Sequence, residues 1–254
     1  MRIGFIYKVN KVPVDYRAAF LSLIKEGIRK SDLNLYEEFY ESDKRDTKPF
    51  CFSVFFQNPK FGSDVIEIGG NTNLYISTLD IELGIRIYNG LLEVKEFSFP
   101  LGETIRKISV FPLKERQIKY FLKEKVCFKT MSSVIVVDKD KRPILHPETK
   151  GKKGLISEKD GINTNKEDFL KELKVSLNPY IKDAQFEFIP INLKKEVIKH
   201  SIGEHLRKGL KRPIKLIGFS GRFILKGRPQ DLYKIYQLGI GFRRNQGFGM
   251  LEVE

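Results

Sequence analysis

The sequence predicts an α+β protein that carries two antiparallel sheets in tandem. The chain has 254 residues and is 41% hydrophobic, which is enough for one large domain or two small ones. Apolar residues recur with helical spacing in some segments, and form short strand-like runs in others. The order of these segments is strand, helix, strand, strand, helix, strand, and this order occurs twice.

The first half of the chain contains the first set of elements. Asp15 is the expected N-cap of a helix with these apolar positions: Tyr16, Ala19, Phe20, Leu23, Ile24 and Ile28. A second helix is predicted for the string LDIELGIRIYNGLL. The predicted strands are Ile3–Val9, Phe50–Gln57 and Leu74–Leu79, followed by a strand pair across Glu93–Leu113. This order is that of the ferredoxin-like unit.

The second half repeats the order of elements without repeating the sequence. An amphipathic helix is predicted from Lys166, and a short helix at Gln230–Leu238 leads into a glycine-rich loop. The predicted strands are Val126–Asp138, Gln185–Leu193, Ile214–Lys226 and Met250–Val253. We therefore predict two tandem ferredoxin-like (RRM-like) domains, at residues 1–120 and 121–254. An antiparallel sheet with helices on one face leaves its other face free, and RNA-recognition modules use that face.

The charge of the chain favours a polyanionic partner. Lys and Arg outnumber Asp and Glu by 46 to 32, which gives a formal net charge of +14, and half of this excess lies in residues 201–254. No stretch approaches the roughly 20 apolar residues of a membrane span, and the N-terminal apolar run is too short for a signal peptide. We expect a cytoplasmic protein that does not insert into membranes.

Metal and cofactor sites are not expected from the residues available. The histidines are His146, His200 and His205, and the two cysteines, Cys51 and Cys127, are isolated in apolar runs. These residues lack the spacing of a zinc site, and the cysteines are expected to be buried free thiols. We predict no metal and no cofactor.

The stretch GIGFRRNQGFG, from Gly239 to Gly249, contains four glycines and two arginines. The glycines predict a shaped loop that lies close to another group, and Arg243 and Arg244 indicate that this group is anionic. The loop follows a helix, whose C-terminal end would repel phosphate, whereas a Rossmann loop precedes its helix. This order argues against a dinucleotide site.

A longer stretch around this loop resembles a known family. Residues 218–253, GFSGRFILKGRPQDLYKIYQLGIGFRRNQGFGMLEV, are similar to the C-terminal signature of the CRISPR-associated repeat-RNA endoribonucleases. These form the Cas6 family of the repeat-associated mysterious protein superfamily. The match includes two G-h-G motifs separated by five residues, in which h is hydrophobic. The stretch FKTMSSVIVV is similar to that family's F-x-x-x-S-P-I-x-V, with Ser133 in place of proline.

The resemblance implies a protein that binds the repeat of a CRISPR precursor transcript and cuts one phosphodiester to give crRNA. Cleavage would need no metal, because the neighbouring 2′-hydroxyl attacks and leaves a 2′,3′-cyclic phosphate. The implied partners are CRISPR repeat RNA and a CRISPR effector complex, and a monomer and a homodimer are both compatible with the sequence. The cleavage site would lie in the N-terminal domain.

Family members usually have a histidine in or after the first helix, and residues 23–52 of this chain contain none. By alignment with the family, Tyr40 or Ser42 stands where that histidine would be, and Lys48 matches a lysine before the second strand. Lys25 matches a helix position that several members fill with a polar catalytic residue. The candidate catalytic residues are therefore Lys48, Lys25 and Tyr40, although the string ESDKRDTK is also compatible with a solvated charged loop.

The candidate RNA contacts come from the loop and from the basic segment before it. In the loop they are Gly239, Gly241, Arg243, Arg244, Asn245, Gln246, Gly247 and Gly249. Arg222 is expected to project from the strand face opposite Phe219 and Phe223. The basic stripe consists of Lys194, Lys195, Lys199, Arg207, Lys208, Lys211, Arg212 and Lys215.

Two alternatives stay open at this point. The missing histidine is compatible with a paralogue that binds repeat RNA without cutting it. The composition is also compatible with a basic two-domain metabolic enzyme. His200 and His205 are expected to contact RNA or to lie on the surface, and His146 to be inert.

Overall fold

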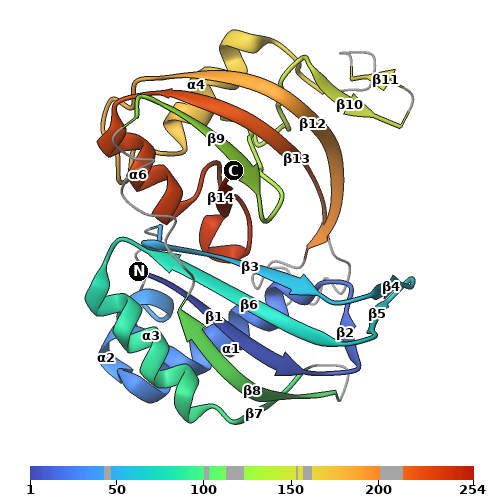
Figure 1. The fold of residues 1–254 in the computed structure, drawn as a ribbon, viewed down its shortest axis with the longest axis vertical. Coiled ribbons are helices and arrows are strands. Elements are labelled where there is room, and N and C mark those ends of the chain that lie inside the picture. The colour runs from blue at the N-terminus through green and yellow to red at the C-terminus, as the bar shows by residue number, and fades with distance from the viewer. Residues whose placement is uncertain (43–46, 100–102, 113–122, 153, 157–161, 201–213) are drawn as a thin grey trace. The chain divides into compact units, whose positions relative to one another are not determined.

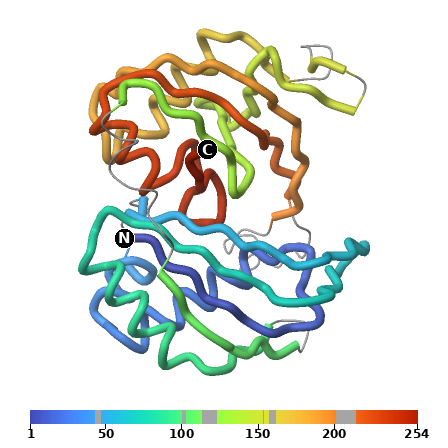
Figure 2. The backbone as a smooth tube through the Cα atoms, viewed as in Figure 1, coloured from blue at the N-terminus to red at the C-terminus, as the bar shows by residue number. Residues whose placement is uncertain are grey.

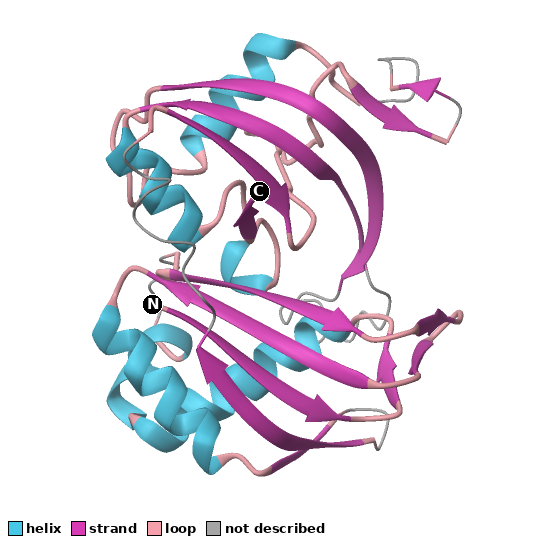
Figure 3. Ribbon diagram, in the orientation of Figure 1, coloured by secondary structure: helices cyan, strands magenta, loops and turns pink. Residues whose placement is uncertain are grey.

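The computed structural model describes residues 1–42, 47–99, 103–112, 123–152, 154–156, 162–200 and 214–254. The chain divides into two compact units. Unit 1 contains Met1–Leu113, with Lys199, His200 and Ile214 among its described residues; unit 2 contains Lys114–Ile198 and Lys215–Glu254. Both units combine helices with antiparallel strands, so the α+β class is confirmed (Figure 3). The predicted boundary at residue 120 lies outside the described residues and stays a prediction.

Unit 1 is built on a five-stranded sheet with the order β3-β6-β1-β8-β7 (Figure 1). Its strands are β1 (Arg2–Lys8), β3 (Phe50–Phe56), β6 (Asn71–Thr78), β7 (Glu96–Ser98) and β8 (Thr104–Pro112). β1 pairs antiparallel with β6 and β8, and β3 pairs antiparallel with β6. Because β6 lies between β1 and β3, the sheet has the split β-α-β arrangement predicted for a ferredoxin-like unit.

The helices of unit 1 cover one face of this sheet (Figure 3). They are α1 (Tyr16–Ser31), α2 (Leu33–Tyr40) and α3 (Ile81–Glu93). Phe20 and Leu23 of α1 and Ile87 of α3 are fully or almost fully buried in one core with Phe5 and Phe52 of the strands. The predicted apolar face of α1 is therefore the face that forms the core.

Helix starts follow local capping only in part. Asp15 stands at the N-cap position of α1, as predicted, but its side chain makes no capping hydrogen bond. Asp80 caps α3, because its carboxylate accepts a hydrogen bond from the Leu83 N–H. Asp32 caps α2 by accepting from the Leu35 N–H. We did not predict α2, nor a small sheet of β2 (Lys11–Pro13), β5 (Val65–Ile68) and β4 (Pro59–Phe61).

Unit 2 contains a six-stranded sheet with the order β11-β10-β12-β13-β9-β14. Its strands are β9 (Lys125–Thr130), β10 (Thr149–Gly151), β11 (Gly154–Leu155), β12 (Phe186–His200), β13 (Ile214–Gly227) and β14 (Leu251–Val253). β13 lies between β9 and β12, which repeats the split arrangement of unit 1. The trace in Figure 2 follows this second unit from green to red. Here β10 and β11 are additions that the sequence did not predict.

Helices α4 (Lys166–Val175) and α6 (Pro229–Leu238) supply the other layer of unit 2. Phe169 of α4 and Ile235 of α6 are fully buried in the core with Phe128, Phe219 and Phe223 of the strands. In the part of the chain that the structure describes, no helix has the length and apolarity needed to cross a membrane.

The predicted strand Val126–Asp138 is wrong beyond Thr130, where β9 ends. The Met131 N–H then donates to the Met250 carbonyl, and Val134 and Ile135 form isolated bridges to Phe219 and Phe242. The apolar run that reads as strand therefore pairs residue by residue with two different segments. Strand β12, by contrast, extends to His200, beyond the predicted end at Leu193. Cys51 and Cys127 are free, as expected, but Cys127 is only half-buried.

Helices α1 and α3 cross at two glycines. A Cβ built on Gly90 would lie 1.8 Å from the Gly27 carbonyl oxygen, and one built on Gly27 would lie 2.9 Å from the Leu91 side chain. The contact at Gly90 is with backbone, which cannot rotate away. The helical layer of unit 1 therefore depends on the absence of a side chain at Gly90.

Gly90→Ala is expected to lower the free energy of unfolding by about 1–3 kcal/mol, because the helices must separate to admit the methyl group. Gly84→Ala in the same helix is the matched control, since its Cβ would first meet the Sδ atom of the flexible Met1 side chain, at 2.6 Å, and no backbone atom as near. Urea denaturation of the two variants checks this. Equal losses in both variants would contradict the proposed role of the helix crossing.

Candidate nucleic-acid interface

The loop from Gly239 to Gly249 has a backbone that suits glycine at four positions. The φ angles of Gly239, Gly241, Gly247 and Gly249 are 77°, 82°, 87° and 69°. These values lie in the left-handed region, which other L-residues adopt at a cost. Gly239 ends α6, and a short 3₁₀ turn, Arg244–Gln246, occupies the middle of the loop.

The loop is held close to the backbone of its own unit. The Phe242 N–H donates to the Ile135 carbonyl at 2.8 Å, and the Gly249 N–H donates to the Ser133 carbonyl at 2.9 Å. A Cβ on Gly249 would lie 1.9 Å from the Ile240 carbonyl oxygen, and one on Gly241 would lie 2.7 Å from the Ile135 carbonyl oxygen. Gly241 therefore approaches the segment after β9, whereas Gly249 approaches Ile240 within the loop itself.

The two arginines of the loop have different surroundings. Arg244 is 2% exposed, and its guanidinium carbon lies 5.0 Å from the ring centroid of Tyr180, as in a cation–π contact. Arg243 is half-buried, and its Nη1 donates to Gln246 Oε1 at 3.0 Å. Burial lowers the pKa of Arg243, although a guanidinium stays charged at neutral pH. Of the two side chains, Arg243 is better placed to meet an anion, while Arg244 packs inside unit 2.

The remaining loop candidates differ in exposure. Asn245 and Gln246 are half-buried, and the glycines shape the backbone. Phe248 is completely buried and contributes to a small cluster with Ile135 and Ile198. The sequence did not identify Tyr180, because it lies far from Arg244 along the chain and no motif links them.

Arg222 projects from the sheet face opposite the core, as predicted. It is exposed, while Phe223 beside it is buried. Its Nη1 lies 3.5 Å from Glu254 Oε2, a loose surface ion pair that leaves guanidinium N–H groups for other acceptors.

The described part of the basic stripe is accessible. Lys194, Lys199 and Lys215 are exposed, and Lys195 is half-buried. Lys199 Nζ donates to the Ser63 carbonyl at 3.0 Å. The other members of the stripe lie outside the described residues: Arg207, Lys208, Lys211 and Arg212.

In unit 1 the structure brings together Lys25 and Tyr40. Lys25 Nζ, on α1, lies 4.5 Å from the ring centroid of Tyr40 at the end of α2. Lys48 Nζ lies 5.7 Å from the ring centroid of Phe39, whose ring in turn contacts that of Tyr40. The sequence did not identify Phe39. The two lysines thus lie beside the aromatic pair of Phe39 and Tyr40. We call these four residues the Lys25–Lys48 cluster.

The Tyr40 hydroxyl is strongly perturbed by its surroundings. Burial, with a smaller effect from Tyr36, raises the pKa of Tyr40 well above its usual value. Its hydroxyl oxygen is buried and has no hydrogen-bond partner among the residues that the structure describes. At neutral pH Tyr40 is therefore a phenol that can donate a proton or a hydrogen bond, and it is not a base.

The described histidines have contacts of their own. The His146 ring packs against Phe169 and Phe188 in the core of unit 2, and burial lowers its pKa. His200 is 3% exposed, with Nδ1 3.5 Å from Asp15 Oδ1. His205 lies outside the described residues. Over the described ranges, no group of three His, Cys, Asp or Glu side chains could hold a metal ion.

The family model described as "CRISPR associated protein Cas6, C-terminal" matches residues 113–253, which is more than half of the chain. The chain belongs to the CRISPR-associated Cas6 family. The glycine-rich loop and the segment on which it lies both fall inside this match. The resemblance found in the sequence is thereby confirmed.

Solved Cas6 structures share the fold over the full chain. A RAMP protein described as binding different RNA substrates is 18% identical, with a TM-score of 0.72, and the match covers 100% of this chain and 99% of the other. A Cas6-related protein from Pyrococcus furiosus is 20% identical, with a TM-score of 0.70 and coverage of 100% and 98%. A Cas6 product complex is 15% identical, with a TM-score of 0.60 and coverage of 100% and 99%. At these identities the likeness establishes the fold. No curated protein sequence matches the chain.

For this Cas6 chain, Gly249→Ala is expected to lower the free energy of unfolding by about 2–5 kcal/mol, because a positive φ and a backbone clash act together. Gly154→Ala separates the two effects. Gly154 also has a positive φ, of 120°, but a Cβ there would have no atom within 4 Å. Gly154→Ala should therefore lower the free energy of unfolding by only about 1 kcal/mol. Chemical denaturation measures both, and equal losses would show that the close approach to Ile240 is unimportant.

Proposed function

We propose that this Cas6 family protein is a metal-independent endoribonuclease that binds CRISPR repeat RNA in the precursor transcript and cleaves it to give crRNA in the cytoplasm. One observation carries the proposal. The family match over residues 113–253 contains a loop whose four glycines all have positive φ and whose Arg243 is half-exposed. The similar structures described as a product complex and as an RNA-binding RAMP protein support it.

Different residues have different proposed tasks. RNA binding is assigned to Arg243, Arg222 and the exposed lysines Lys194, Lys199 and Lys215, because ammonium and guanidinium groups bind phosphates. Arg207, Lys208, Lys211 and Arg212 belong to the same proposal. Cleavage is assigned to the Lys25–Lys48 cluster of unit 1.

The proposed chemistry needs no metal. The 2′-oxygen attacks the adjacent phosphorus and gives its proton to a solvent water molecule, and the bond from phosphorus to the 5′-oxygen breaks. The products are a 2′,3′-cyclic phosphate and a 5′-hydroxyl, which receives a proton. Lys25 and Lys48 would stabilise the added negative charge on the phosphate oxygens, and Tyr40, which is protonated, would donate to the leaving oxygen.

The absence of a histidine near the candidate cleavage residues favours a second function, RNA binding without cleavage. Residues 23–52 contain no histidine, and both described histidines are engaged elsewhere, His146 in a core and His200 with Asp15. A Cas6 family protein that binds repeat RNA without cutting it is compatible with this. Incubation of the repeat RNA with excess protein distinguishes the two functions, since a pure binding protein gives a stable complex and no product.

The cleavage mechanism predicts the behaviour of a modified substrate. Repeat RNA transcribed from the CRISPR array of the source genome should be cut in the presence of EDTA, and the upstream fragment should end in a cyclic phosphate. The same RNA with a single 2′-deoxyribose before the cleaved phosphate should resist cleavage, because the nucleophile is missing. Mass spectrometry of the fragments measures both outcomes. Normal cutting of the deoxy substrate, or loss of cutting in EDTA, would contradict the mechanism.

A further inference from the structure

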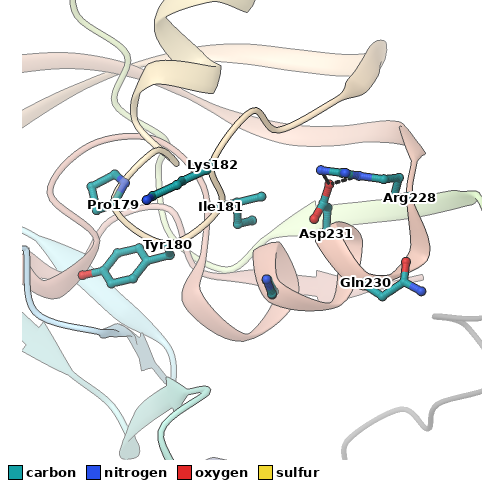
Figure 4. Close-up of a pocket in the computed structure, with 8 residues that line it drawn as sticks. Pro179, Tyr180, Ile181, Lys182, Arg228, Gln230 and Asp231 are labelled. Carbon is teal, nitrogen blue, oxygen red and sulfur yellow. Dashed lines mark hydrogen bonds and ion pairs between the residues drawn. The ribbon is translucent and has the colours of Figure 1, made fainter.

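A pocket in unit 2 contains basic residues that the RNA-binding assignment above does not use. It has a volume of about 550 Å³ and lies between residues 179–182, which follow α4, and the first turns of α6 (Figure 4). Pockets of roughly 300–1,000 Å³ are the usual size for small-molecule sites. This pocket is therefore large enough for one nucleotide.

One charge pair in the pocket is already satisfied. Arg228 Nε and Nη2 each lie 2.7 Å from Asp231 Oδ2, and the dashed lines in Figure 4 mark this pair. Asp231 is 5% exposed, so its carboxylate is both buried and neutralised. The pocket's acidic residue therefore does not cancel its other positive charges.

Those other charges are two lysines from opposite sides of the pocket. Lys182, in the segment after α4, is exposed, and Lys234, on α6, is half-buried. Neither ammonium has a hydrogen-bond or ion-pair partner among the described residues. Two uncompensated ammonium groups that border one pocket favour a phosphate as its ligand.

The pocket also has a wall suited to the rest of a nucleotide. Pro179, Tyr180 and Ile181 line it beside Lys182. Bases and ribose rings pack on aromatic and apolar surfaces of this kind. Gln230, which is exposed on α6, adds an amide that can donate and accept hydrogen bonds.

Tyr180 connects this pocket to the glycine-rich loop. Tyr180 is one of the residues that line the pocket, and its ring carries the guanidinium of Arg244, whose carbon lies 5.0 Å from the ring centroid. Arg243, the loop residue assigned to RNA, directly precedes Arg244. A strand of RNA held at the loop therefore has a basic pocket next to it, which favours RNA over a free nucleotide as the occupant.

We propose that this pocket is a further RNA subsite that holds one nucleotide of the bound repeat, with its phosphate between Lys182 and Lys234 and its ribose and base against Tyr180. The proposal rests on the proposed RNA binding. It adds a contact point outside both the glycine-rich loop and the basic stripe.

The test compares two double variants that remove the same charge. Lys182→Gln with Lys234→Gln alters the pocket, whereas Lys139→Gln with Lys171→Gln alters two exposed lysines elsewhere in unit 2. Fluorescence anisotropy measures the Kd of each protein for the repeat RNA at several salt concentrations. The pocket variant should bind roughly threefold to tenfold more weakly, and its slope of log K against log salt should fall by about 0.7, the loss of one phosphate contact. The control variant should keep the slope of the unchanged protein.

The outcomes separate this proposal from the one on which it rests. If the unchanged protein shows no salt-dependent RNA binding, both proposals are wrong. If it binds and the pocket variant binds equally well, only the subsite is wrong. Adenosine monophosphate provides the other arm, since the pocket could serve a free nucleotide. Binding of the mononucleotide that the pocket variant loses, without any change in RNA affinity, would also overturn the RNA subsite.

Discussion

The close contact between the glycine-rich loop and the segment after β9 organises unit 2. Two backbone hydrogen bonds, from Phe242 to Ile135 and from Gly249 to Ser133, hold the loop there. A Cβ at Gly241 would lie 2.7 Å from the Ile135 carbonyl oxygen, so the close approach depends on the absence of a side chain at this position. The same contact places β14 beside β9 at one edge of the sheet. It also fixes the two arginines, with Arg243 half-exposed and Arg244 turned inward onto Tyr180.

This arrangement gives the arginines complementary tasks. Arg244 is buried as a cation on an aromatic ring, and its packing contributes to the position of the segment that contains Tyr180. Arg243 keeps its positive charge near the surface of the same loop. The positive charge proposed to bind RNA is thus held on a loop whose backbone is hydrogen-bonded in place. The proposed cleavage residues belong to unit 1, where Lys25 lies over Tyr40. Binding and cleavage are therefore assigned to separate residues, with Arg243 of the loop in unit 2 and the Lys25–Lys48 cluster in unit 1.

Much of the fold follows from periodicity, and the exceptions have physical reasons. The main strands and helices of both units were predictable, because their apolar residues alternate or recur at helical spacing. Helix α2 was missed because Asp32 follows α1 directly and caps the next helix, without a glycine or proline to separate them. The apolar residues after Thr130 predict a strand, but Val134 and Ile135 form only isolated bridges, to Phe219 and Phe242. At the site, the glycines were readable from spacing alone. The burial of Arg244 was not, since it depends on Tyr180, which is distant in sequence, and the basic pocket beside Tyr180 has no sequence motif.

The separation of binding from cleavage is tested most directly by measuring both for two single variants on one repeat RNA. Lys48→Ala should lower the single-turnover cleavage rate by about 10²-fold or more and change Kd by less than about threefold, as expected for a group that acts in the transition state. Arg243→Gln should raise Kd by roughly fivefold while cleavage at saturating protein stays close to that of the unchanged chain. An unchanged cleavage rate in Lys48→Ala, with RNA fully bound, would contradict the account.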